Sequence, residues 1–167
     1  MAGSFNFSFT FKLLIIYEML KKIHLLLADD DPDDRFFFDK ILGLLPIPTH
    51  LTMVEDGQKL MHFFSKTAEQ LPDALFLDLN MPRKNGSECL KEIKGDFKLK
   101  DLPVIIYSTS LHEDIAELLY KEGAHYYVRK GGLDELKETL HYILNLMVEK
   151  KFTRPPKDKF ILSVLKK

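Results

Sequence analysis

"LLLADDDPDD" (residues 25–34) and "LFLDLNMPRKNG" (residues 75–86) each run from a continuous apolar segment directly into acidic or amide side chains. Short apolar runs without alternation are typical of strands that are buried on both faces of a parallel sheet. The two stretches therefore predict parallel strands whose carboxyl ends carry charge. In open parallel sheets ligands bind beyond these ends, so a functional site is expected there.

The same pattern recurs along the chain. Helically spaced segments follow each of five short apolar segments, at residues 23–28, 50–56, 73–80, 102–110 and 125–132. Five strands alternating with five helices predict an α/β fold with a parallel sheet and right-handed crossovers. Ser87 is the expected cap of the third helix, and Asp33 and Asp34 are expected in the solvated first turn of the first helix.

The composition is that of one globular domain with a substantial core. Of 167 residues, 46% are hydrophobic and 29% are charged, and the formal net charge is -1. Because there is no basic excess to neutralise phosphates, a general nucleic-acid binder is excluded. The single cysteine, Cys89, excludes an intramolecular disulfide and a zinc cluster, and it favours a reducing, cytoplasmic setting.

The amino-terminal residues 1–18 precede the regular pattern. Their apolar stretch is interrupted by Lys12 and Glu18, is too short to span a bilayer and lacks the early positive charge of a secretory signal. No membrane partner is expected. We interpret this segment as an extension that is not native or is disordered, with an amphipathic arm for a partner as the alternative.

The regular pattern predicts one domain over residues 19–150, followed by a tail over residues 151–167. The tail breaks at Pro155-Pro156 and then carries a small apolar patch. Three interpretations of the tail stay open: a dimer arm, a strand-like extension that packs on the domain, and a disordered segment.

Side chains suited to phosphoryl chemistry stand at the expected strand ends. They are Asp29 and Asp30 after the first strand, Asp78 and Asn80 after the third, Ser108, Thr109 and Ser110 at the fourth, and Arg129 and Lys130 at the fifth. One or two carboxylates suffice to bind Mg²⁺, and Asp29 or Asp30 with Asp78 would supply them. The metal and the Lys130 ammonium would offset the repulsion among the three carboxylates.

These residue types predict a reaction as well as a metal site. An ionised aspartate is a competent nucleophile toward phosphorus, so Asp78 would form an aspartyl phosphate. The Ser108 hydroxyl, the Lys130 ammonium and Mg²⁺ would then receive the added oxygens. Arg129 is the alternative to Lys130, but period-two alternation directs it to the opposite face, which favours Lys130.

Together with "VIIYSTS" (104–110) and "GAHYYVRKGG" (123–132), the two opening stretches resemble the receiver domain of two-component response regulators, over about residues 21–150. The resemblance implies a flavodoxin-like (βα)5 three-layer sandwich with strand order 2-1-3-4-5. It also implies that Asp78 is the phosphoacceptor and that Asp29 and Asp30 are the acidic pair that holds Mg²⁺ or Mn²⁺.

The resemblance assigns further roles around Asp78. Asn80 would lend its backbone carbonyl to the metal, and Asn80 and Ser110 would tune dephosphorylation. Ser108 and Tyr127 stand at the switch positions of the family, and Lys130 at its lysine position. The family lysine is usually followed by proline, whereas Gly131 follows Lys130 here, which makes this loop more mobile.

The implied function is that of a stand-alone phospho-accepting switch rather than an enzyme, with slow self-dephosphorylation. A sensor histidine kinase or a phosphotransfer protein would donate the phosphoryl group, and a downstream protein would read the changed surface. Tyr126 and Tyr127, expected to be exposed, and the helix near residues 111–123 would form that surface. A phosphorylation-linked dimer stays open.

Two rival functions remain. The first is a Mg²⁺-dependent aspartyl-phosphate phosphatase or transferase, which is disfavoured because such enzymes generally carry a second acid where Asn80 stands. The second is a receiver-like adaptor that is never phosphorylated, which the complete set of acids, hydroxyl and lysine disfavours.

Overall fold

Strand β1 (Ile23–Ala28) lies inside a parallel sheet, as its uninterrupted apolar sequence predicts. Its last four residues are fully buried, and their side chains alternate between the two layers that enclose the sheet. Strands β2 (Thr49–Val54) and β3 (Ala74–Leu77) pair with β1 in parallel on either side. This computed structural model describes residues 22–67, 70–110 and 112–163.

The complete sheet has the strand order β2-β1-β3-β4-β5-β6, and all neighbouring strands are parallel. Its remaining strands are β4 (Val104–Ser108), β5 (Tyr126–Arg129) and β6 (Ile161–Leu162). The predicted order 2-1-3-4-5 is confirmed. The five predicted strands did not include β6, which pairs with β5 and comes from the tail.

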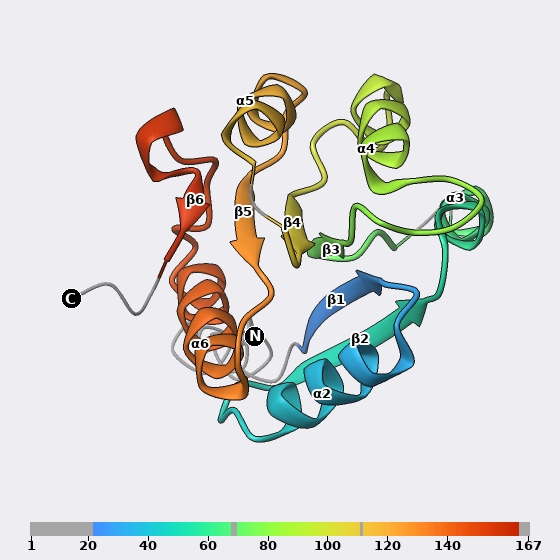
Figure 1. Cartoon of the computed structure of the whole chain (residues 1–167). Coiled ribbons are helices and arrows are strands. Elements are labelled where there is room, and N and C mark those ends of the chain that lie inside the picture. The colour runs from blue at the N-terminus through green and yellow to red at the C-terminus, as the bar shows by residue number, and fades with distance from the viewer. Residues whose placement is uncertain (1–21, 68–69, 111, 164–167) are drawn as a thin grey trace, which may run out of the picture.

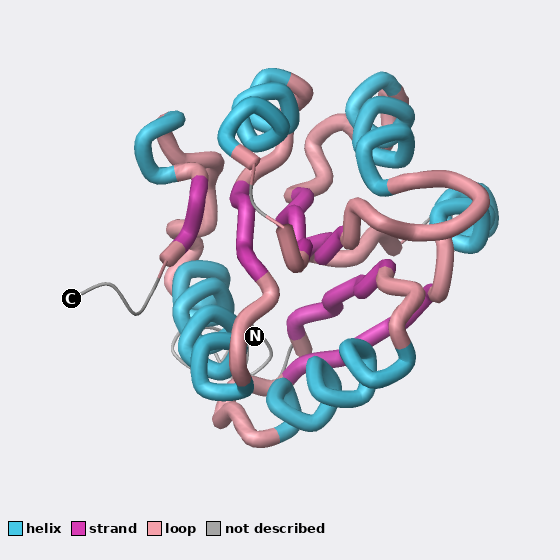
Figure 2. Tube along the Cα trace, viewed as in Figure 1, coloured by secondary structure: helices cyan, strands magenta, loops and turns pink. Residues whose placement is uncertain are grey.

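Helices cover both faces of the sheet, so the predicted three-layer sandwich is confirmed (Figures 1 and 2). One face carries α2 (Pro32–Gly43) and α6 (Leu133–Val148). The opposite face carries α3 (Gly57–Lys66), α4 (Gly86–Gly95) and α5 (Glu113–Lys121). None of the described helices is long and apolar enough to cross a membrane.

The start of α4 is fixed by its cap and by its contact with the end of β3. Asn85 caps the helix in a reciprocal pair with Glu88, so the prediction of Ser87 as the cap was wrong by two residues. Gly86 follows directly, and a Cβ there would overlap the carbonyl of Asp78. The loop between β3 and α4 is therefore held against Asp78.

The described part of the tail packs on the domain and adds a two-residue strand to the sheet. After a short 3-10 turn at η1 (Lys157–Lys159), Phe160 enters the core beside Tyr120 and Tyr127, and β6 follows. Of the three interpretations of the tail, the structure has the strand-like extension. The predicted amino-terminal extension, residues 1–18, lies outside the described residues.

Candidate functional site

Backbone hydrogen bonds bring the carboxyl ends of neighbouring strands to one edge of the sheet. The Asp78 N–H donates to the Ala28 carbonyl at 2.9 Å, and the Asp29 N–H donates to the Val54 carbonyl at 3.0 Å. On the other side, the Lys130 N–H donates to the Ser108 carbonyl at 2.8 Å. The ladder thus continues past the strands and aligns the residues that follow them.

Three carboxylates meet at this edge. Asp29, Asp30 and Asp78 each offer an oxygen within 4.8 Å of the others; Asp29 and Asp78 are buried, and Asp30 is exposed. Burial raises the pKa of Asp29 to about 6, and the charge of Asp78 adds to the rise, whereas Lys130 opposes it. A hard divalent cation prefers oxygen ligands and would relieve the repulsion between these acids, so the donor set fits such an ion.

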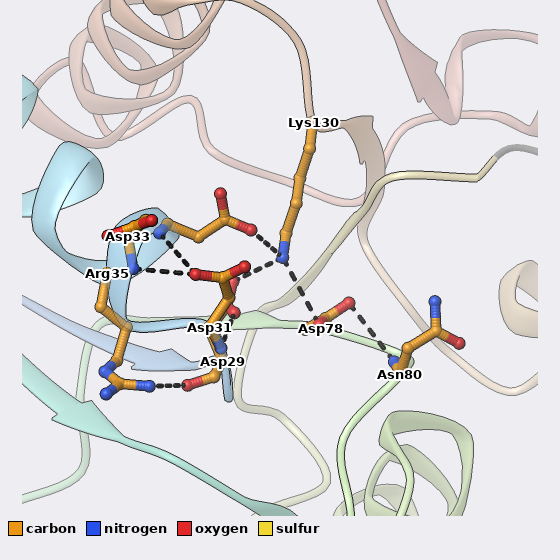
Figure 3. A network of polar contacts seen from close by, with 8 residues as sticks. Asp29, Asp31, Asp33, Arg35, Asp78, Asn80 and Lys130 are labelled. Atoms are coloured by element: carbon orange, nitrogen blue, oxygen red, sulfur yellow. Dashed lines mark hydrogen bonds and ion pairs between the residues drawn. The ribbon is translucent and has the colours of Figure 1, made fainter.

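The Lys130 ammonium lies among carboxylates from three elements (Figure 3). Its Nζ is 2.7 Å from Asp29 Oδ2, 2.8 Å from Asp34 Oδ2 and 3.4 Å from Asp78 Oδ2. Burial lowers the pKa of Lys130, but its hydrogen bonds with Asp29 and Asp34 outweigh that effect and hold the pKa above its ordinary value. Lys130 is therefore a fixed positive charge beside Asp78, whereas the alternative, Arg129, is exposed.

The turn after β1 is organised by Asp31. Its side chain accepts hydrogen bonds from the N–H groups of Asp33 and Asp34, at 2.8 and 3.4 Å, and so caps α2. Arg35, one residue further, donates to the Asp29 carbonyl at 2.7 Å (Figure 3). The expectation that Asp34 only begins the helix was incomplete, because its carboxylate also reaches Lys130.

Ser108 ends β4 with its hydroxyl fully buried. Within the described part of the chain, Ser108 Oγ has no hydrogen-bond partner with normal geometry. A buried hydroxyl in that situation carries an uncompensated desolvation cost. The Tyr127 hydroxyl is a polar neighbour of Ser108 Oγ but is not aligned with it for a well-formed hydrogen bond, so an incoming oxygen would supply the aligned acceptor that Ser108 lacks.

Tyr126 and Tyr127 are buried, with 7% and 1% of their surface exposed, so the prediction that they form an exposed reading surface was wrong. The physical reason is the tail: Phe152 stacks on Tyr126 at 5.7 Å, and Phe160 meets the Tyr127 ring edge-to-face at 6.3 Å. The Tyr127 hydroxyl donates a hydrogen bond to the Ser110 carbonyl. Tyr127 therefore already points into the core.

The predicted tuning positions, Asn80 and Ser110, follow the ends of β3 and β4. Asn80 and Ser110 are both exposed, and the Asn80 N–H donates to Asp78 Oδ1 at 3.3 Å. The side chain of Asn80 extends beyond Asp78 in Figure 3. Asn80 therefore lies beside Asp78, and the tuning role of both residues stays a prediction.

An ion pair that sequence reasoning missed holds the loop after Asp78. Arg83 has a positive φ of 67°, and its Nη2 lies 2.5 Å from Oδ2 of the buried Asp56, which caps α3. Left-handed backbone is unfavourable for a residue with a Cβ, so the ion pair helps to retain this turn. The "MPRKNG" sequence indicated a turn but not the partner of its arginine.

The response regulator receiver domain family matches residues 25–141. The response regulator Rcp1 of Synechocystis sp. is 33% identical over 111 residues, which are 64% of this chain and 76% of Rcp1. The sensory transduction protein LytT of Oceanobacillus iheyensis is 26% identical over 146 residues, and the match covers 86% of this chain but 56% of LytT.

Solved structures of response regulators agree with these matches. The Mn²⁺-bound form of Rcp1 is 30% identical, with a TM-score of 0.69, and the match covers 80% of this chain and 99% of that one. The phosphorylated cyanobacterial phytochrome response regulator RcpA is 29% identical, with a TM-score of 0.71, and the match covers 81% and 100%. The chain belongs to the response regulator receiver domain family of two-component signalling.

Proposed function

We propose that this protein is a phospho-accepting switch in which Asp78 receives the phosphoryl group. The observation that carries the proposal is the position of the buried Asp78 carboxylate, which lies within 4.8 Å of the Asp29 and Asp30 ligand atoms and 3.4 Å from Lys130 Nζ. Carboxylates that can hold a cation on one side and an ammonium on the other would place positive charge around a transferred phosphoryl group. A related protein, RcpA, is known in a phosphorylated form.

The proposed transfer is a single displacement at phosphorus. An Asp78 carboxylate oxygen forms the new O–P bond while the P–N bond of a phosphohistidine donor breaks, and the donor imidazole leaves with the electron pair and takes up a proton. Lys130 and the Ser108 hydroxyl bind the equatorial oxygens as charge builds on them. Hydrolysis later breaks the same O–P bond by attack of water at phosphorus and restores Asp78.

We propose that the site binds a divalent cation, Mg²⁺, with Mn²⁺ as a substitute. Its ligands would be Asp29, Asp30, Asp78 and the backbone carbonyl of Asn80. When bound, the cation neutralises charge on the phosphoryl oxygens. The buried, mutually repelling carboxylates of Asp29 and Asp78 support this assignment. So does the related Rcp1, which is known in a Mn²⁺-bound form.

Ser108 and Tyr127 are the proposed switch residues. A phosphoryl oxygen would draw the buried Ser108 hydroxyl toward Asp78. Tyr127 is already inside the core, so the change would reach the surface through its hydrogen bond to the Ser110 carbonyl and through α5 rather than by an inward turn of its ring. Asn80 and Ser110 would set the rate at which water reaches the acyl phosphate.

We propose a cytoplasmic sensor histidine kinase or phosphotransfer protein as the donor and a downstream protein as the reader of the phosphorylated form, either directly or through a dimer. The proposed receiver unit runs from about residue 19 through β6, because Phe160 and β6 complete the core beside β5. Residues 1–18 are proposed as an extension outside this unit.

The proposal is tested by counting turnovers with a small acyl phosphate and Mg²⁺. A switch should release phosphate only slowly, through self-dephosphorylation, and Asp78→Asn should abolish uptake. Fast, sustained multiple turnover of phosphate esters would instead indicate the phosphatase or transferase. Absence of any uptake by the parent, under conditions in which Mg²⁺ binds, would indicate the adaptor.

A further inference from the structure

The carboxylate of Asp34 pairs with Lys130 but is not one of the candidate metal ligands. It comes from the first turn of α2 and lies 2.8 Å from Lys130 Nζ, closer than Asp78 at 3.4 Å. Asp34 is not among the three carboxylates that share one cation site. Its only described polar contact through the carboxylate is the one with Lys130, so its position bears on the lysine rather than on the metal.

The three partners of Lys130 differ in how easily they can release it. The side chain of Asp29 is fully buried and that of Asp78 is 7% exposed, whereas that of Asp34 is 33% exposed. Releasing the ammonium would leave a buried carboxylate without compensation, which is costly, but water can solvate Asp34. Of the three ion pairs of Lys130, the one with Asp34 therefore costs the least free energy to break.

The loop that carries Lys130 is fixed on its other side by α6. The carboxylate of Glu135 accepts from the Gly132 N–H at 3.3 Å and fills the space where a Cβ of residue 131 would lie. Glu135 thus holds the backbone near Lys130 in place. The position of the ammonium then depends on the conformation of the lysine side chain. Asp34 binds the ammonium from the α2 side at 2.8 Å, whereas Asp78 lies 3.4 Å from it at the end of β3.

We propose that Asp34 is a positioning residue that competes with the phosphoryl group on Asp78 for the Lys130 ammonium. This inference rests on the proposed function of Asp78. With its charge paired to Lys130, Asp34 also reduces the repulsion that the ammonium exerts on a cation at Asp29 and Asp30. Asp34 therefore favours metal binding and opposes phosphoryl binding, and its removal shifts the two affinities in opposite directions.

The test compares the parent with Asp34→Asn, Asp34→Ser, Asp34→Glu and the control Asp33→Asn. Asp33 occupies the same helical turn, is exposed and shares the Asp31 cap, but no described contact joins it to Lys130. Mg²⁺ affinity is measured by titration calorimetry. Affinity for beryllofluoride, an analogue of the phosphoryl group, is measured by fluorine NMR at saturating Mg²⁺.

For Asp34→Asn and Asp34→Ser we expect Mg²⁺ affinity to fall about threefold or more and beryllofluoride affinity to rise by a similar factor. Asp34→Glu should restore both values toward those of the parent, and Asp33→Asn should change neither by more than about twofold. Equal effects of Asp33→Asn and Asp34→Asn, or shifts of both affinities in the same direction, would overturn the role of Asp34. Failure of the parent itself to bind beryllofluoride would overturn the function proposed for Asp78.

Discussion

The backbone N–H of Tyr127 donates a 2.9 Å hydrogen bond to the carbonyl oxygen of Phe160. This bond joins the predicted switch position to a segment that lies beyond the last helix of the predicted domain. The Phe160 ring is 2% exposed and also meets Tyr120 edge-to-face at 5.2 Å. The segment around Phe160 is therefore packed into the core beside β5.

Phe160→Ala should lower the free energy of unfolding by about 3–5 kcal/mol, because it leaves a cavity between Tyr120 and Tyr127. Phe97→Ala is the matched control, since its ring is 84% exposed, and it should change stability by no more than about 0.5 kcal/mol. Urea denaturation of the two variants measures both values. Equal stabilities would show that Phe160 adds nothing to the core in solution.

Lys130→Met should change the affinity for Mg²⁺ and the affinity for the phosphoryl group, each in the direction opposite to that expected for Asp34→Asn. Removing the ammonium should strengthen Mg²⁺ binding, because the carboxylates lose a competing positive charge, and it should weaken or abolish phosphoryl uptake. Without Mg²⁺ the variant should lose about 3 kcal/mol of stability, since the buried Asp29 loses its ion pair.

The control for Lys130→Met is Arg129→Met, which changes an exposed cation next to it in the sequence. It should leave Mg²⁺ affinity, phosphoryl uptake and stability close to those of the parent. Loss of uptake in Arg129→Met with uptake retained in Lys130→Met would reverse the assignment of the cation.

Gly131→Ala should destabilise the protein by about 1 kcal/mol, because a Cβ there displaces the Glu135 carboxylate from the Gly132 N–H that it caps. In a Glu135→Ala background the same change should cost much less, and a double-mutant cycle in urea measures the difference. Gly43→Ala, where a Cβ meets nothing within 4 Å, is the control. A cost of Gly131→Ala that is independent of Glu135 would contradict this account of the loop.

His125 makes stability depend on pH. Burial lowers the pKa of His125 from 6.5 to about 4, and the charges of Lys94 and Arg154 contribute. Between pH 4 and 6.5 the unfolded chain then binds more protons at this histidine than the folded protein does, so stability rises with pH across this window and is lost as pH falls through it. Protonation also removes the Nδ1 acceptor of the Val104 N–H.

Replacing His125 with Gln should remove most of this dependence, which is about 2 kcal/mol between pH 7 and pH 4.5 after allowance for partial solvent contact. The exposed His141→Gln serves as the control, and urea midpoints across the pH range are the measurement. A stability profile for His125→Gln as steep as that of the parent would exclude His125 as the cause.

The sheet and the residues at its edge could be predicted from the sequence because both follow from local patterns. Fully apolar runs such as residues 25–28 specify buried parallel strands, and parallel strands bring their carboxyl ends together whatever lies between them. The positions of Asp29, Asp78 and Lys130 directly after such runs are therefore enough to predict that the three side chains meet.

The missed features depend on contacts between segments that are distant in sequence. Strand β6 is two residues long and lacks a strand-length pattern, and its position depends on Phe160 filling a gap beside Tyr127. The pairing of Asp34 with Lys130 spans 96 positions, and periodicity could only assign Asp34 to a helical turn. Tyr126 and Tyr127 were expected to be exposed because the sequence left open whether the tail packs on the domain, and it did not indicate where.

The most direct test of the central claim is to locate the phosphoryl group. The protein is incubated with Mg²⁺ and a small acyl phosphate, the acyl phosphate is reduced with borohydride to the corresponding alcohol, and the modified residue is identified by tandem mass spectrometry. Asp39→Asn, an exposed change on α2, is the control, and it should label like the parent. The account predicts one modified residue, Asp78, and none in Asp78→Asn. Modification at another residue, or equal labelling of Asp78→Asn, would contradict it.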